Sequence, residues 1–183
     1  MENEESPFIM IYDRMFDLDL PVKELLVYAL IHGFNRDGWE CFGIKKSIAE
    51  RLRMQPSGVS RALSDLKRRK LISETFWAEG GSTLFAEFND TGPYIKVYDW
   101  MLSLRLPGRE LLAFSLIYGF SRNGKVCFGR REWIGKRLHI SNPGKVISSL
   151  KKRGLIRETY KPDDSPVLVV TGQSGQKLHN LSN

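Results

Sequence analysis

The sequence predicts an α+β fold, mainly α with small β wings, in two similar tandem domains. Three observations predict it. The chain repeats itself, each repeat carries apolar residues at helical spacing, and each repeat ends in two β-prone segments around a turn. The predicted domains are residues 1–92 and 93–172, followed by a polar tail at 173–183.

The composition is that of a globular chain: 42% of the 183 residues are hydrophobic and 27% are charged. No stretch approaches the roughly 18 apolar residues that a membrane helix needs. The first residues are acidic, unlike a signal peptide. Two cysteines, Cys41 and Cys127, cannot form a disulfide framework. We therefore expect a cytoplasmic protein with no membrane partner, and its net charge of +7 favours a polyanionic one.

The internal repeat extends from Ile9 to Glu74. An offset of 86 residues aligns Tyr12 with Tyr98 and the run Cys41-Phe42-Gly43 with Cys127-Phe128-Gly129. Further along, the offset falls to 84 and aligns Glu74 with Glu158. Because chance similarity does not hold register over such a length, the chain is interpreted as a tandem duplication.

Each copy predicts the same order of elements. A helix follows Pro21 or Pro107, and a turn at 35–38 or 121–124 leads into a short strand at 39–42 or 125–128. A short helix comes next, at 44–52 in the first copy. A longer helix is expected at 57–70 or 143–153. Two strands close each copy, at 72–77 and 83–88 or at 156–160 and 167–171. This order predicts a helix-turn-helix with a wing.

One stretch resembles bacterial winged helix-turn-helix proteins: Ile48-Ala49-Glu50-Arg51-Leu52, then Gly58-Val59-Ser60-Arg61-Ala62-Leu63-Ser64-Asp65-Leu66, then Lys70-Leu71-Ile72. Upstream, the helix that starts at Leu20-Pro21 and the strand that ends at Cys41-Phe42 look like proteins of bacterial plasmids, phages and mobile elements. Members of that group include replication initiators and transcription regulators. The resemblance covers nearly all of both copies and implies DNA binding.

Two departures from the pattern of these proteins concern the helix-turn-helix. Arg53 and His139 stand where the turn usually has glycine, so we expect a less regular turn. Gly135 stands where the first copy has Ala49, and the second copy is two residues shorter in the turn. We therefore expect a different entry angle for its last helix.

Basic residues gather in both predicted helix-turn-helix segments. Residues 1–92 hold 12 Lys and Arg against 15 Asp and Glu, a net charge of −3, and residues 93–183 hold 16 against 6, a net charge of +10. Within these halves, residues 43–72 contain nine basic and two acidic residues, and residues 129–157 contain nine and one. Two basic segments at equivalent places favour double-stranded DNA as the partner over an ordinary solvated surface.

An α-helix fits the DNA major groove, where its exposed side chains meet base edges while flanking Lys and Arg meet phosphates. Arg61 is the first candidate for base readout, because its guanidinium can bind guanine O6 and N7. The candidate DNA-binding residues face outward from the longer helix or open the shorter one: Lys45, Lys46, Ser57, Ser60, Arg61, Ser64, Lys67, Arg68, Arg130, Arg131, Asn142, Lys145, Ser148, Ser149, Lys151 and Lys152.

The sequence predicts a non-catalytic protein without cofactor or metal, because it has no phosphate-binding glycine loop, nucleophile elbow or paired-carboxylate motif. Transcription regulation is the first interpretation. A plasmid or phage replication initiator, or a primosome-type protein, is a second. A third is a protein-interaction module in which a winged helix of the −3 half binds a partner. A homodimer, or contact with a replication or transcription protein, is compatible with each of them.

Overall fold

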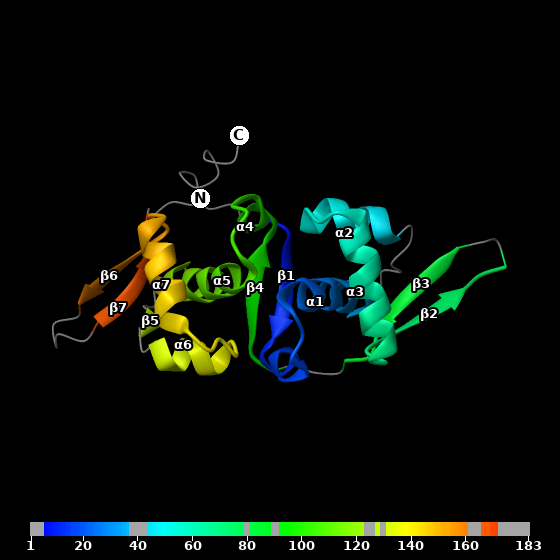
Figure 1. Cartoon of the computed structure of the whole chain (residues 1–183), viewed down its shortest axis with the longest axis horizontal. Helices are drawn as coiled ribbons and strands as arrows, with labels where there is room; N and C mark the ends of the chain where they lie inside the picture. Colours follow the sequence, from blue (N-terminus) through cyan, green and yellow to red (C-terminus); the bar gives the residue numbers. More distant parts are fainter. Residues whose placement is uncertain are drawn as a thin grey trace. The chain divides into compact units, whose positions relative to one another are not determined.

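The computed structural model describes residues 6–36, 44–78, 81–88, 92–122, 127–128, 131–160 and 166–171 (Figure 1). They form two compact units. The first unit is Ile9–Tyr94, and the second is Ile95–Asn183 together with Met1–Phe8. The division falls after Tyr94, and the predicted boundary is after residue 92. Within the first unit, the Asp13 N–H donates a hydrogen bond to the Pro93 carbonyl at 2.8 Å.

The first unit, over its described residues, begins with a short strand, continues with helices and ends in an antiparallel hairpin. Its elements are β1 (Phe8–Tyr12), the 3₁₀ helix η1 (Asp13–Leu18), α1 (Val22–Arg36), α2 (Ile44–Leu52), α3 (Pro56–Arg68), β2 (Ile72–Phe76) and β3 (Ser82–Ala86). In the hairpin, Ile72 lies opposite Ala86 and Phe76 opposite Ser82. Figure 1 shows α3 crossing one end of α1 and the hairpin extending beyond α3.

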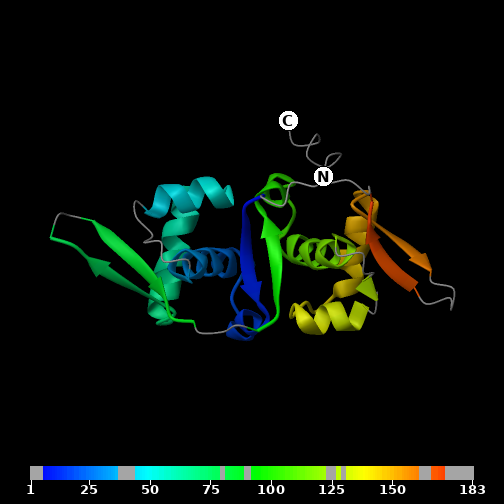
Figure 2. The same cartoon turned by 180° about the vertical axis from the view of Figure 1, so that it is seen from behind.

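The second unit repeats this order. Its elements are β4 (Tyr94–Tyr98), α4 (Asp99–Ser103), α5 (Gly108–Arg122), β5 (Cys127–Phe128), α6 (Arg131–Arg137), α7 (Pro143–Lys152), β6 (Ile156–Tyr160) and β7 (Pro166–Val170). Strand β5 pairs with β7, so the sheet has the order β5-β7-β6, which Figure 2 shows from behind. The α+β class with small antiparallel sheets is thus confirmed. The strand and the short helix that precede α1 and α5 were not predicted.

Helices α3 and α7 each pack into their unit through one buried face. On α3 the buried residues follow helical spacing: Val59, Ala62, Leu63 and Leu66. On α7, Ile147 and Leu150 are buried, whereas Val146 is only half-buried. Burial of one face leaves the opposite face of each helix exposed.

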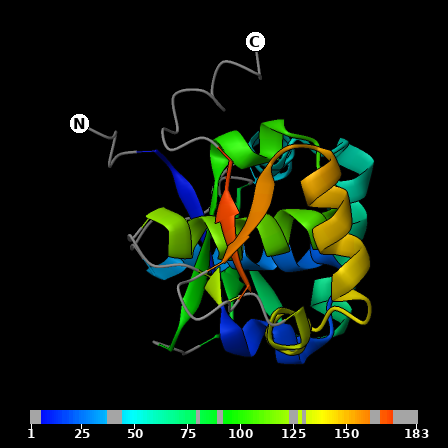
Figure 3. The ribbon, with the colours of Figure 1, turned by 90° about the vertical axis from the view of Figure 1, so that its left-hand side faces the viewer.

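The turn predicted at 35–38 and 121–124 is wrong at its first residues, because Asn35 and Ser121 lie in the last turns of α1 and α5. Residues 37–38 and 123–124 lie outside the described part of the chain. Asn35 donates through Nδ2 to the Leu84 carbonyl at 3.0 Å and accepts from the Ala86 N–H at 2.8 Å. Ser121 Oγ accepts from the Val170 N–H at 3.3 Å. Each helix end is therefore tied to its hairpin; Figure 3 shows α5 and the β6–β7 hairpin in an end-on view of the second unit.

The turn between the two helices is equally regular in both units. Arg53 has φ 51° and His139 has φ 52°, so both take the left-handed conformation that glycine adopts at little cost. A second equivalent pair, Lys70 with φ 59° and Gly154 with φ 70°, follows α3 and α7. The less regular turn expected from the missing glycine is therefore not observed.

We expect Gly154→Ala to lower the free energy of unfolding by about 1 kcal/mol, because left-handed backbone costs a residue with Cβ roughly that much. No atom lies within 4 Å of the added Cβ, so steric contact adds nothing. Lys70→Ala is the matched control. It should change stability by less than about 0.5 kcal/mol, since a side chain already stands at that φ. Urea unfolding measures both, and equal losses would contradict the explanation.

Within the part of the chain that the structure describes, no helix combines the length and the apolar character needed to cross a membrane.

Candidate nucleic-acid interface

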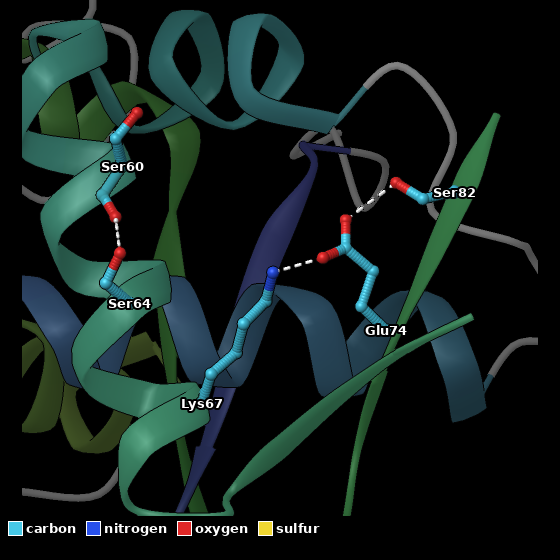
Figure 4. A network of polar contacts seen from close by, with 5 residues as sticks. All are labelled: Ser60, Ser64, Lys67, Glu74 and Ser82. Atoms are coloured by element: carbon cyan, nitrogen blue, oxygen red, sulfur yellow. Dashed lines mark hydrogen bonds and ion pairs between the residues drawn. The ribbon is translucent and has the colours of Figure 1, made fainter. Parts of the chain in front are cut away.

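The exposed face of α3 carries a line of polar side chains, Ser57, Arg61, Ser64 and Arg68, which we call the α3 stripe. Their spacing of four, three and four residues places them on one side of the helix. Ser64 Oγ donates to the Ser60 carbonyl at 3.0 Å, as Figure 4 shows, so its lone pairs remain available. Arg61 makes no hydrogen bond or ion pair with another described residue. Its guanidinium donors are therefore open to solvent or a ligand.

The second unit repeats this pattern on α7, where the α7 stripe consists of Lys145, Ser148 and Lys152, all exposed. At the start of the helix, Asn142 Oδ1 accepts a hydrogen bond from the Lys145 N–H at 3.1 Å and caps it. Ser149 is half-buried at the edge of the stripe. The structure thus brings together three of the predicted second-copy residues in the same order as in α3.

The cations that open the shorter helices lie apart from the stripes in sequence. Lys45 and Lys46 are exposed in the first turn of α2, and Lys46 Nζ lies 4.0 Å from Glu50 Oε1. Because both side chains are largely exposed, this pair adds little to stability. Arg131 is the first residue of α6. A Cβ placed on Gly144, in the first turn of α7, would lie 4.0 Å from Arg131 Nη1, so this guanidinium is close to the start of α7. Arg130 lies outside the described residues.

Three further cations among the predicted DNA-binding residues already have an anionic partner. Lys67 pairs with Glu74 of β2, and Lys151 pairs with Glu158 of β6. Arg68 Nη2 lies 2.6 Å from Asp65 Oδ1. The first two pairs join the end of each helix to its hairpin, so in the free protein these lysines hold the hairpins. A phosphate would have to compete with a carboxylate for them.

Sequence reasoning did not identify Glu74 and Glu158 as partners of these lysines. The signal was present, because the same lysine and glutamate recur seven residues apart in both copies. Glu74 also accepts a hydrogen bond from Ser82 Oγ at 2.7 Å, so one carboxylate joins α3 to both strands of the hairpin (Figure 4). In the second hairpin, Pro166 is at the position of Ser82 and has no hydroxyl to donate.

Hydrogen bonds from Lys67 and then Ser82 hold the pKa of Glu74 below its usual 4.5. A carboxyl group whose pKa is lowered by folding stabilises the fold above its unfolded pKa, and this contribution is lost as pH falls through the folded value. We therefore expect the free energy of unfolding to decrease as pH falls below 4.5, and to decrease less in Glu74→Gln. Urea unfolding over a pH series measures this. Glu50→Gln, at an exposed carboxylate, is the control, and an effect of equal size there would contradict the prediction.

Comparisons with protein-family models, with curated proteins and with solved structures give no match. The candidate interface is therefore defined by its geometry alone. Two helices, α3 and α7, expose a cation, a serine and a second cation at equivalent positions. At the first of these positions, Arg61 and Lys145 have no ion-pair partner among the described residues.

Proposed function

We propose that the chain is a non-catalytic protein that binds double-stranded DNA through two tandem winged helix-turn-helix units and regulates transcription in a bacterium or in one of its mobile elements. One observation carries the proposal. The α3 and α7 stripes offer the same chemistry at the same positions: Arg61 and Lys145, Ser64 and Ser148, Arg68 and Lys152. Duplication preserved this order while many neighbouring residues changed.

The element order supports the winged-helix part of the proposal. In each unit two helices are followed by an antiparallel hairpin. In the second unit, the short strand β5 precedes these helices and pairs with β7, the second strand of the hairpin. A helix pair built into a small sheet in this way is the arrangement that the resemblance to winged helix-turn-helix proteins implies. It also exposes one face of the second helix to a ligand.

The chemistry of the stripes suits the major groove. An arginine or lysine can donate to guanine O6 and N7, and this contact discriminates against the wrong base by about 1–3 kcal/mol. Serine is small, so it allows close approach and can donate to phosphate or to a base. Two such helices on one chain reinforce each other, since binding of one unit raises the effective concentration of the other.

The test is the salt dependence of binding to a labelled duplex. If Lys and Arg side chains neutralise several phosphates, log K should fall linearly with log salt, by about 0.9 for each contact. A flat dependence would contradict the proposal. Single-stranded DNA of the same sequence is the control, and its slope should be shallower, about 0.7 for each contact.

A further inference from the structure

Three consecutive cations lie at the end of each helix that carries a stripe. An offset of 84 residues aligns the two groups position by position, so differences between them are differences between equivalent places. The groups are Lys67, Arg68 and Arg69 at the end of α3, and Lys151, Lys152 and Arg153 at the end of α7.

In the first unit each of the three cations has a partner within the unit. Lys67 is paired with the hairpin, as described above. Arg69 Nη1 donates a hydrogen bond to the Leu18 carbonyl at 3.3 Å. Between them, Arg68 Nη2 lies 2.6 Å from Oδ1 of Asp65, three residues earlier on α3. The stripe cation of this group is therefore held by a carboxylate of its own helix.

In the second unit the two outer cations are held in a similar way. Lys151 is paired with the hairpin, and Arg153 Nε lies 3.1 Å from Glu110 Oε2 of α5. The middle cation, Lys152, is exposed and makes no hydrogen bond or ion pair with another described residue. At the position where α3 has a neutralised arginine, α7 thus has an available lysine.

One substitution between the copies accounts for this difference. Ser149 of α7 stands where α3 has Asp65. Helix α7, Pro143–Lys152, contains no aspartate or glutamate along its length. Serine carries no charge, so the positive charge of Lys152 is not offset from within the helix.

On the basis of the DNA binding proposed above, we propose that Asp65 withholds Arg68 from the DNA backbone, so that at this position of the two stripes only Lys152 binds a phosphate. A phosphate that approached Arg68 would also meet the carboxylate of the pair, and the two anions repel each other. The pair has no net charge, so it releases few counterions when DNA binds. Because the Arg68 side chain is 76% exposed, the pair adds little to stability, and its effect falls on binding.

The two units then differ in how they hold a duplex. A phosphate contact does not depend on the base sequence, so Lys152 strengthens binding to any duplex. The neutral pair on α3 gives no such contribution. Binding at that helix has to come from other groups, and Arg61 is the cation of the α3 stripe that remains available.

The experiment uses the full chain and a labelled duplex pool of random sequence, with binding titrated against salt. Lys152→Ala should make the slope of log K against log salt shallower by about 0.9, which is an about eightfold smaller loss of affinity between 0.1 M and 1 M salt. Arg68→Ala should leave the slope nearly unchanged. Both variants change only an exposed side chain.

Exchanging the residue that differs between the copies tests the cause. Asp65→Ser should steepen the slope by about 0.9, because it frees Arg68, and adding Arg68→Ala to it should remove this gain. Ser149→Asp should make the slope shallower by a similar amount. Glu87→Ser is the matched control: it removes one exposed negative charge outside both helices and should not change the slope. The urea midpoint of each variant should stay close to that of the wild type.

A flat salt dependence of the wild-type chain would overturn the proposed function and this inference with it. If the wild-type slope is steep, equal effects of Arg68→Ala and Lys152→Ala would overturn the inference alone. Weaker duplex binding by Asp65→Ser would do the same, since Asp65 would then itself contribute to binding DNA. An equal gain in Glu87→Ser would show that net charge, rather than release of Arg68, sets the slope.

Discussion

Replacing Gly135 with alanine should destabilise the second unit by about 1–3 kcal/mol. A Cβ at this position would lie 2.9 Å from Pro143 Cγ and 3.0 Å from the Ile140 carbonyl oxygen. The carbonyl belongs to the backbone and the proline ring is rigid, so neither can move aside cheaply. Gly135 thus allows α6 to lie close against the start of α7, and a larger residue would push the two helices apart.

Two variants control for the general effect of exchanging glycine and alanine. Gly119→Ala, in the interior of α5, meets no atom within 4 Å and should stabilise the chain by about 0.5–1 kcal/mol, because alanine favours helix. Ala49→Gly, at the equivalent position of α2, should cost about 1 kcal/mol. Urea unfolding of the full chain measures all three. A neutral or stabilising effect of Gly135→Ala would show that the close approach is not required.

The double variant Arg61→Ala/Lys145→Ala should weaken duplex binding by at least about 30-fold. Each cation belongs to an exposed stripe, and a base contact of this kind contributes about 1–3 kcal/mol, so two contribute at least about 2 kcal/mol. Neither side chain supports the fold, because neither has an ion-pair or hydrogen-bond partner among the described residues. Arg61→Ala alone should also relax the preference for guanine at one position of the site.

The matched control removes two other exposed cations at equivalent positions, Lys23 of α1 and Arg109 of α5. Lys23→Ala/Arg109→Ala lowers the net charge by the same amount and lies outside both stripes. It should reduce affinity by much less, and its loss should be similar for all sequences. Equal losses in the two double variants would mean that overall charge, rather than the stripes, determines binding.

The sequence predicts the repeat, the order of the main elements and the buried face of α3, because these depend on local spacing. Val59, Leu63 and Leu66 stand at helical intervals, and all three are buried. The cap of α7 is Asn142, a residue type that favours this position. Exposure of Arg61, Ser64 and their equivalents follows from the same periodicity.

Contacts between distant residues could not be predicted in the same way. Asparagine is typical of turns, but Asn35 lies in the last turn of α1. Its side-chain amide makes hydrogen bonds there to the backbone of β3. The pairing of Lys67 with Glu74 depends on how the hairpin folds back onto α3. Arg53 and His139 take a left-handed conformation that neither residue favours by itself, because the packing of the flanking helices imposes it.

The most direct test of the central claim is amide chemical-shift mapping of the full chain with and without a bound duplex. If α3 and α7 both meet DNA, the largest changes should fall within Pro56–Arg68 and Pro143–Lys152, while the amides of Trp77 and Phe85 in the first hairpin change little. Changes confined to one unit, or centred on residues outside both helices, would contradict the claim that the chain carries two DNA-binding helices.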